Sequence, residues 1–290
     1  MSEDVEEEVP EDSGKRAFEY PPDFLDPGLP KGVLSPSQFG MYKRCPRQYE
    51  YAYVQGLRKP PGISMLKGTA IHKGAEVVHK HTIATGLRMP MEQAVQEVSD
   101  EFEEGLEDIE KDPDVNVGEA KDRTLSNFRV YYVQAVPLIR PVAAEKTFAV
   151  KIGTVPMRGV IDLIDRVPGE VVLGVDDPDN PPLVEVVSDL KTTTKKWTDQ
   201  MVNHSVQMTI YALVENTPRI RVDLLIDQKS GTKYLPIRAL RTNREKQVIV
   251  EDIEEMASLV KKGVFPRCLP DAWVCTQRFC GYYAECRGPK

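Results

Sequence analysis

The sequence predicts a mixed α/β fold, in which N-terminal helices wrap a sheet core. Two short segments, Gly159–Asp165 and Leu183–Lys191, are dominated by Val, Ile and Leu and bounded by Pro, Gly and Asp, which is typical of strands. Upstream of them, segment 90–110 carries apolar residues at a spacing of four, which indicates an amphipathic helix. The order of helices, strands, helix and strands therefore favours a mixed sheet with helices packed against it.

The N-terminal part of the chain is expected to be helical. Ser35 has the character of an N-cap, because Pro36 follows at the first helical position and Gln38 completes a capping-box pattern. This helix should run toward Cys45 and end there, since Pro46 cannot continue it. Further helices are expected from Gly68 onward and over residues 90–110 and 118–136.

The sheet is expected to begin near Ala144. A Gly153-Thr154 turn between two alternating segments predicts a hairpin. The run Asp176–Pro182 is so rich in Pro, Asp and Asn that it predicts a loop before the central strand, Leu183–Lys191. The hairpin strands are expected at Glu145–Ile152 and Val155–Val167, and a short strand at Val171–Val175. Two later strands are expected at Arg219–Asp227 and Lys233–Leu240. Two helices are expected at Thr198–Glu215 and Asn243–Gly263.

These elements predict a single domain preceded by a tail. Residues 1–32 combine acidic residues with Pro and Gly and are expected to be disordered. The chain is 41% hydrophobic, which suffices for one substantial core or two modest ones over residues 33–290. Within that domain we expect a helical part, a sheet core with the candidate site, and a helix followed by a cysteine-rich end, over residues 33–143, 144–242 and 243–290.

The net charge of −7 at first argues against a polyanionic partner. Residues 1–12, however, hold seven Asp and Glu and no Lys or Arg, so the remainder is nearly neutral and leaves room for a basic groove. The acidic tail is most simply a solvated extension open to protein partners; a mimic of nucleic acid that inhibits the protein's own site is the less favoured hypothesis. No run approaches the roughly 20 apolar residues of a membrane span, so we expect a cytoplasmic protein (host cytoplasm, if viral) without a membrane partner.

Asp189 and Lys191 end the central strand and point to one face, because side chains two apart in a strand share a face. An Asp and a Lys at the end of an apolar strand are costly to desolvate unless they bind something. For an isolated Asp-x-Lys, a salt-bridged sheet edge would be the favoured interpretation. The motifs elsewhere in the chain favour a site instead.

The five cysteines suggest a metal or cluster, because disulfides are rare inside cells and three of the thiols are closely spaced. Those three are Cys275, Cys280 and Cys286, and a fourth ligand must come from far away in the sequence. This pattern suits an iron–sulfur cluster better than zinc, which usually takes two close pairs, although zinc remains open. Cys45, beside Pro46, is the best candidate for the fourth ligand. Cys268 is compatible with an unliganded buried thiol.

Several short motifs follow one another over residues 34–290. They are Leu34-Ser35-Pro36-Ser37 with Tyr42 and Cys45-Pro46, then Gly68-x3-His72, Gly159-x2-Asp162, Asp189-Leu190-Lys191, Gln207-x3-Tyr211, and Cys275, Cys280 and Cys286. With these motifs the sequence resembles the PD-(D/E)XK nuclease superfamily, in particular RecB-like nucleases with an iron–sulfur cluster, such as AddB-type nuclease domains, the CRISPR adaptation exonuclease and phage exonucleases. Two features depart from the family: four residues rather than two separate Cys275 from Cys280, and the interval from Asp162 to Asp189 is long.

The resemblance implies a restriction-endonuclease-like core, a mixed sheet flanked by helices, with a C-terminal iron–sulfur segment. It also implies a Mg²⁺- or Mn²⁺-dependent deoxyribonuclease that hydrolyses phosphodiester bonds. The expected activity is that of an exonuclease on single-stranded DNA or duplex ends, in recombination, repair, replication or phage DNA processing, with endonuclease activity left open. The alternative is a catalytically inactive nucleic-acid-binding or assembly module with the same fold.

The resemblance also assigns roles to residues. His72, Asp162, Asp189 and the Leu190 carbonyl would bind the metal, and Lys191 would orient or help to deprotonate the attacking water. Hard divalent cations prefer such oxygen ligands, and the imidazole favours Mn²⁺ somewhat. Gln207 and Tyr211, with His204 in the same helical line, would order the site or touch nucleic acid. The implied ligands of a cluster, most simply [4Fe-4S] with Zn²⁺ as the alternative, are Cys45, Cys275, Cys280 and Cys286.

Other polar and aromatic residues have ordinary interpretations. Glu145 could support the site from behind the ligands, but a charge at a strand end is the favoured interpretation. Asp165 is expected to be a solvent-facing strand residue. Exposed helix positions are expected at Glu76, His79 and His81. Bases could stack on Tyr42, Tyr49 and Tyr51, yet packing around the cluster is an equally good interpretation of these three.

Overall fold

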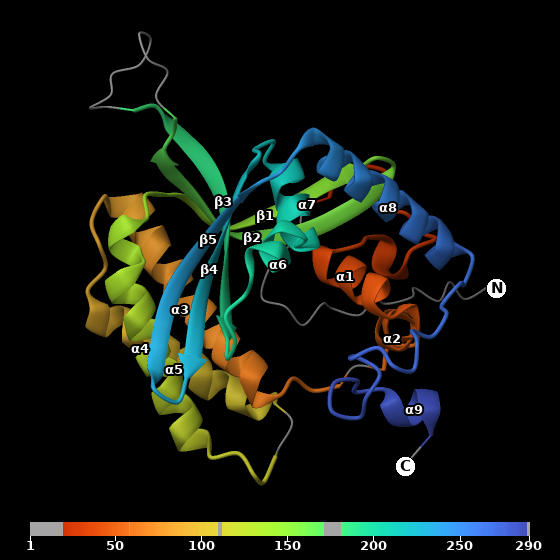
Figure 1. Ribbon diagram of the computed structural model, residues 1–290, viewed down its shortest axis with the longest axis horizontal. Coiled ribbons are helices and arrows are strands. Elements are labelled where there is room, and N and C mark those ends of the chain that lie inside the picture. Colours follow the sequence, from red (N-terminus) through yellow and green to blue (C-terminus); the bar gives the residue numbers. More distant parts are fainter. Residues whose placement is uncertain (1–19, 58, 110–111, 171–180, 289–290) are drawn as a thin grey trace, which may run out of the picture.

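A computed structural model describes residues 20–57, 59–109, 112–170 and 181–288. Its centre is a five-stranded sheet in the order β1-β2-β3-β4-β5. Helices cover both faces of the sheet, and the C-terminal segment folds back beside α1 and α2 (Figure 1). The expected mixed α/β class is confirmed. The strands are β1 (Pro141–Ile152), β2 (Val155–Pro168), β3 (Leu183–Thr193), β4 (Arg219–Gln228) and β5 (Gly231–Leu240).

The helices follow the predicted order, with shifted ends. The first begins as expected, because the Ser35 side chain accepts a hydrogen bond from the Gln38 backbone, and Cys45 separates it from the next. The helix with His72 begins five residues before Gly68. The helices are α1 (Pro36–Arg44), α2 (Pro46–Tyr49), α3 (Ile63–Thr85), α4 (Met91–Glu104), α5 (Val117–Gln134), α6 (Asp199–Asn203), α7 (Val206–Val214), α8 (Asn243–Lys261) and α9 (Tyr283–Arg287).

The topology places β3 at the centre of a mixed sheet. β1 and β2 form the predicted hairpin, which turns at Gly153 with a positive φ of 58° that suits glycine. β3 pairs antiparallel with β2 and parallel with β4, and β5 returns antiparallel along β4. A parallel pair needs a crossover, which α6 and α7 provide between β3 and β4.

Two hydrophobic cores sandwich the sheet. One core includes buried residues of α1, α7 and α8 on one face, with Val187 and Met208 among them. The other includes residues of α3, α4 and α5 on the opposite face, with Leu190 and Leu225 among them. Because Val187 and Leu190 lie on the same strand, β3 is covered from both sides, which gives the central strand its almost continuous apolar character.

The segment expected as one helix over Thr198–Glu215 is two helices, because Ser205 starts a new one. Its side chain accepts a hydrogen bond from the Met208 backbone, as an N-cap does. The buried Arg241 guanidinium donates to the Val202 carbonyl at 2.6 Å and to Thr209 at 2.7 Å, so it bridges the break. Because of this break, α7 can pack on the sheet in a direction that differs from that of α6.

The prediction that residues 1–32 form a disordered tail is wrong for residues 20–32. From Tyr20 onward the chain packs against the fold, and Phe24 and Leu29 are buried. Residues 1–19, which hold the acidic run, lie outside the described residues, as do the short strand expected at Val171–Val175 and most of the loop after it. In the described part of the chain, no helix is both long enough and apolar enough to cross a membrane.

Candidate active site

The candidate site lies where β2 and β3 part. Their pairing ends at Leu163 and Ser188, after which β3 continues along β4 alone. Asp162 and Asp189 are the next residues on the two strands, at the point of separation. The Asp162 carboxylate accepts a hydrogen bond from the Leu190 backbone N–H at 3.0 Å, in place of a strand-to-strand bond. The fork therefore brings both carboxylates and the Leu190 main chain together without exposing unsatisfied backbone.

Helix α3, which covers one face of the sheet with α4 and α5, brings His72 to this fork. Its Nδ1 lies 3.3 Å from Oδ2 of Asp162, and both side chains remain partly accessible. Glu145 on β1 joins them: one ligand atom from each of the three residues lies within 4.8 Å of the others. Two carboxylates and an imidazole at this separation form a donor set that fits a small divalent cation.

Glu145 was expected to be a strand-end charge, and the structure places it inside β1 at the candidate site. Its φ is 52°, in the left-handed region that non-glycine residues rarely adopt. The regular β1–β2 register holds at Ala144 and Lys146, on either side, but not at Glu145. A strained residue beside two other metal-type ligands indicates a functional constraint, because such strain persists only where the surroundings enforce it. The sequence gives no periodicity signal for this local distortion.

Asp189 and Lys191 form an ion pair on one face of β3, as predicted. The ammonium lies 2.8 Å from Oδ2 and 2.9 Å from Oδ1 of the carboxylate. Burial raises the pKa of Asp189 to about 6 and the neighbouring Asp162 charge adds to this, while Lys191 opposes both. Burial alone would lower the pKa of Lys191, but the Asp189 and Asp162 charges outweigh it and raise it. Lys191 is thus held as a cation facing two carboxyl groups.

Gln207 and Tyr211 lie on one face of α7, and Gln207 donates a hydrogen bond to the Tyr211 hydroxyl at 2.8 Å. Burial raises the pKa of Tyr211, and the charges of Asp162 and Asp189 raise it further, so the phenol stays protonated beside the carboxylates. His204, expected in line with them, lies outside α7 and is exposed, because the helix breaks there. The structure therefore brings the Gln207–Tyr211 pair to the site and leaves His204 out.

Asp165, expected to face solvent, is fully buried in an ion cluster behind the fork. Arg221 of β4 pairs with Asp165 of β2 and with Asp223 of its own strand, the latter at 3.0 Å. Tyr234 of β5 donates to Asp223 at 2.6 Å. Breaking such a buried pair typically costs about 3–5 kcal/mol, because the surviving charge stays desolvated. The cluster ties together the strands on either side of β3.

His79, expected on an exposed helix face, is also buried. Its Nε2 lies 2.7 Å from the Tyr131 hydroxyl, and burial lowers the pKa of His79 to about 3, so the ring is neutral. Glu76 and His81 are half-buried. The cavity at the candidate site extends inward to this region, and its polar lining is His72, Glu76, His79, Tyr131, Glu145, Asp162, Ser188 and Asp223.

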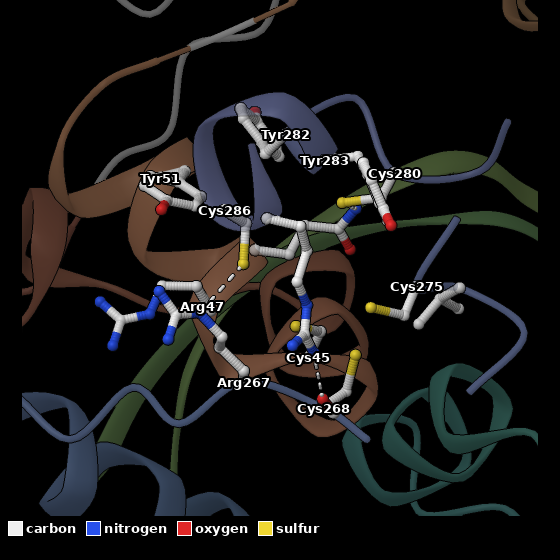
Figure 2. A pocket seen from close by; sticks show the side chains of 13 residues that line it. Cys45, Arg47, Tyr51, Arg267, Cys268, Cys275, Cys280, Tyr282, Tyr283 and Cys286 are labelled. Carbon is white, nitrogen blue, oxygen red and sulfur yellow. Dashed lines mark hydrogen bonds between the residues drawn. The ribbon is translucent and has the colours of Figure 1, made fainter. Parts of the chain in front are cut away.

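All five cysteines line a second pocket, at the opposite end of the molecule from the α3–α5 layer (Figures 1 and 2). None of them forms a disulfide. Cys45 lies between α1 and α2, and the other four come from the segment after α8. Figure 2 shows their sulfur atoms directed into the same space. Cys268, expected to be an isolated buried thiol, is half-exposed and lines this pocket with the others.

Polar groups surround the thiols. Arg267 donates to the Cys286 sulfur at 3.3 Å, and Gln48 contacts the Cys280 sulfur at 3.8 Å. Burial raises the pKa of Cys268 to about 12, and its contacts with Cys45 and Cys275 raise it as well. Burial also opposes ionisation of Cys45, but hydrogen bonds from Cys268, Gln48 and Arg47 lower its pKa overall. Five thiols in one pocket form a soft donor set.

The aromatic residues near this pocket pack against the protein, which was one of the two interpretations of Tyr42, Tyr49 and Tyr51; the other was stacking with bases. Tyr49 is fully buried, and Tyr42 is nearly so and donates its hydroxyl to the Val264 carbonyl at 2.9 Å. Tyr51 stacks on Tyr282 with ring centroids 5.6 Å apart. These rings therefore join α1 and α2 to the C-terminal segment and are not free for bases.

Similarity to known proteins extends over most of this chain. A search of curated proteins finds no match. Among solved structures, one described as an inferred exonuclease from Eubacterium rectale is 12% identical with a TM-score of 0.51, and the match covers 89% of each chain. Another, SSO0001, is 12% identical with a TM-score of 0.41 and covers 88% of this chain and 85% of its own. The model of the PD-(D/E)XK nuclease superfamily matches residues 33–287, most of the chain. This chain therefore belongs to the PD-(D/E)XK nuclease superfamily.

Proposed function

We propose that this protein is a metal-dependent deoxyribonuclease, and that it acts as an exonuclease on single-stranded DNA or duplex ends. The observation that carries the proposal is the meeting of His72, Glu145, Asp162, Asp189 and Lys191 at the β2–β3 fork. These residues come from four separate elements. An inactive binding or assembly module would have no physical reason to hold the buried Asp189 carboxyl group, the Asp162 carboxylate and a lysine together at one point.

The donor set supports a divalent metal, Mg²⁺ or Mn²⁺. The proposed ligands are His72, Asp162, Asp189 and the Leu190 carbonyl, to which the structure adds Glu145. A divalent ion held there would lower the pKa of a bound water and offset the negative charge of a phosphate. The imidazole of His72 supports Mn²⁺, whereas the carboxylate oxygens suit either ion.

The remaining groups act on the substrate and the water. Because neighbouring carboxylates raise the pKa of Lys191, its ammonium serves as a donor that orients the water and stabilises developing charge, in place of a base. Its contact with Asp189 fixes it in that position. Tyr211, kept protonated by burial and the same charges, can donate to a phosphate or a water while Gln207 holds it.

We also propose that the cysteine pocket holds an iron–sulfur cluster, most simply [4Fe-4S], with Cys45, Cys275, Cys280 and Cys286 as ligands. Five free thiols lining one space support this, and zinc is the alternative. The proposed role is structural, because the pocket joins the first helices to the end of the chain. Iron, zinc and acid-labile sulfide analysis of protein purified without oxygen decides between the two metals.

The activity is tested with end-labelled oligonucleotides. Single strands and blunt duplexes, labelled at either the 5′ or the 3′ end, are incubated with Mg²⁺, Mn²⁺ or EDTA. The proposal predicts a ladder of shortened products from one end, present with metal and absent with EDTA. A D189N variant is the matched control, since the amide keeps the shape of the side chain and removes the charge. Cleavage in EDTA would contradict the metal-dependent mechanism, whereas DNA binding without cleavage under any condition would favour the inactive module.

A further inference from the structure

The cysteine-rich segment carries the most exposed aromatic side chains of the described residues. Trp273 is 66% exposed and Phe279 is 54% exposed, whereas every other Phe, Trp and Tyr ring in the described part is buried or half-buried. Burying such a ring stabilises a protein by roughly 1.5–3 kcal/mol, so leaving two of them in water forgoes a large gain. Exposed aromatic pairs of this kind mark interaction sites.

The two rings form one platform. Their centroids lie 5.5 Å apart at an interplanar angle of 77°, an edge-to-face pair that fixes both rings relative to each other. The Arg278 guanidinium lies 5.3 Å from the centre of the Phe279 ring. An aromatic surface with an adjacent arginine offers stacking to a base and charge to a phosphate.

The charge around the platform is opposite to that of the whole protein. Residues 262–288 hold four Lys and Arg against two Asp and Glu, while the complete chain has a net charge of −7. One of the two acids, Glu285, is already paired with Lys59 at 2.7 Å. The thiolates of the proposed cluster would offset this positive excess, so the charge that complements a polyanion at the two rings is that of Arg278.

The platform is connected to the candidate active site through the backbone. Its segment packs on two residues upstream of α3, with Tyr282 against Tyr51 and Glu285 against Lys59. The stretch that holds these two residues leads directly into α3, the helix that carries His72 (Figure 1). The segment that carries the platform therefore packs against the chain that precedes the helix with His72.

We propose that Trp273, Phe279 and Arg278 form a stacking platform for the unpaired bases of single-stranded DNA. This rests on the proposed nuclease function and narrows its substrate, because only unpaired bases offer their faces to a protein ring. Duplex DNA, whose bases are already stacked, would contact the segment through phosphates alone.

The test uses the fluorescence of Trp273. The protein has two tryptophans, and W197F leaves Trp273 as the single reporter. In EDTA, which prevents cleavage, this protein is titrated with a thymidine oligonucleotide, with the same backbone carrying abasic sites, and with a blunt duplex. The platform predicts quenching by the single strand, and little or none by the abasic strand or the duplex. Equal responses to the normal and abasic strands would overturn it.

Affinity measurements on variants give a second readout that does not depend on a tryptophan signal. By fluorescence anisotropy of labelled oligonucleotide, W273A and F279A should each weaken single-strand binding by about five-fold or more, whereas F279Y should retain it. L269A is the matched control, because Leu269 is 71% exposed on the same segment. Binding by W273A and F279A at the wild-type level would overturn the platform and leave the rings to a protein partner.

The two proposals fail in different ways. If the wild-type protein cleaves DNA with metal but W273A and F279A bind single strands as tightly as the wild type, the platform proposal is wrong and the nuclease proposal stands. If the single strand quenches Trp273 and no DNA is cleaved with any metal, the platform stands as a binding site and the nuclease proposal is wrong.

Discussion

The two candidate sites are built on opposite kinds of scaffold. The carboxylate site lies at the centre of the sheet, where hydrogen-bonded strands and two cores fix each residue. The cysteine pocket is assembled from the ends of the folded chain, and the only helix after α8 among the described residues is the five-residue α9. The first site can therefore form without a metal, whereas we expect the second to depend on the proposed cluster, which would tie its segments together.

This comparison predicts that damage to the first site removes chemistry and leaves the fold, while damage to the second loosens the fold. The residues behind the fork support the first half of that statement. The Arg221 cluster and the Asp162 hydrogen bond to Leu190 hold the strands in place without any ligand.

The largest effect is expected from Lys191→Ala. Loss of the ammonium removes the group proposed to stabilise developing charge, so the single-turnover cleavage rate should fall at least about 100-fold, with DNA binding retained. K195A is the control, because Lys195 is exposed just beyond the same strand. Equal rates for the two variants would show that Lys191 has no part in the chemistry.

Cys280→Ser should act on the fold. If Cys280 is a ligand of the proposed cluster, its loss should lower the iron content and reduce the melting temperature by about 5 °C or more, since metal binding contributes directly to folding free energy. C268S is the matched control within the same pocket, and it should keep its iron. The comparison between the two regions would fail if K191A melted as early as C280S, or if C280S kept both its metal and its stability.

Glu145→Gln should weaken metal binding. The substitution preserves the shape of the side chain but removes the negative charge of one of the three residues whose ligand atoms lie within 4.8 Å of one another. Calorimetric titration with Mn²⁺ should show an affinity about ten-fold lower than that of the wild type. E251Q, an exposed glutamate on α8, should bind as the wild type does. An unchanged affinity in E145Q would remove Glu145 from the site.

The smallest effect concerns pH. Burial lowers the pKa of His79 to about 3, below its ordinary 6.5, so the folded protein keeps the ring neutral while the unfolded chain takes up a proton. The stabilising contribution is complete above pH 6.5 and is lost as pH falls toward 3, by about 1.4 kcal/mol per pH unit. Urea unfolding at pH 6.5 and 5 should show this slope in the wild type and a smaller one in H79Q. Parallel slopes would mean that His79 is accessible to protons.

Much of this architecture is readable from local sequence, and the exceptions share one cause. The hairpin at Gly153 and the spacing of Asp189 and Lys191 are local features, which the sequence predicted correctly. Asp165 was misjudged because its partner, Arg221, lies two strands away across the sheet. The split between α6 and α7 depends on Arg241, some forty residues beyond the start of that segment.

The candidate site divides in the same way. Motif residues could be assigned to it because their family resemblance is carried by short spacings, such as Gly68-x3-His72. Glu145 was missed because its place depends on a backbone distortion that neither alternation nor composition reveals. Cys268 was set apart because its distance from Cys275 in the sequence did not suggest a shared pocket. Sequence patterns report on residues that are close together in the chain, so they do not reveal contacts that form only when the chain folds.

The central claim is that side chains from distant parts of the chain meet around one divalent ion. Anomalous diffraction from a crystal soaked in Mn²⁺, recorded on both sides of the manganese absorption edge, locates that ion directly. The account predicts a manganese peak in contact with His72, Asp162 and Asp189 at the β2–β3 fork, and no such peak there in a D162N crystal. A well-ordered manganese elsewhere with this fork empty, or a peak that survives in D162N, would contradict it.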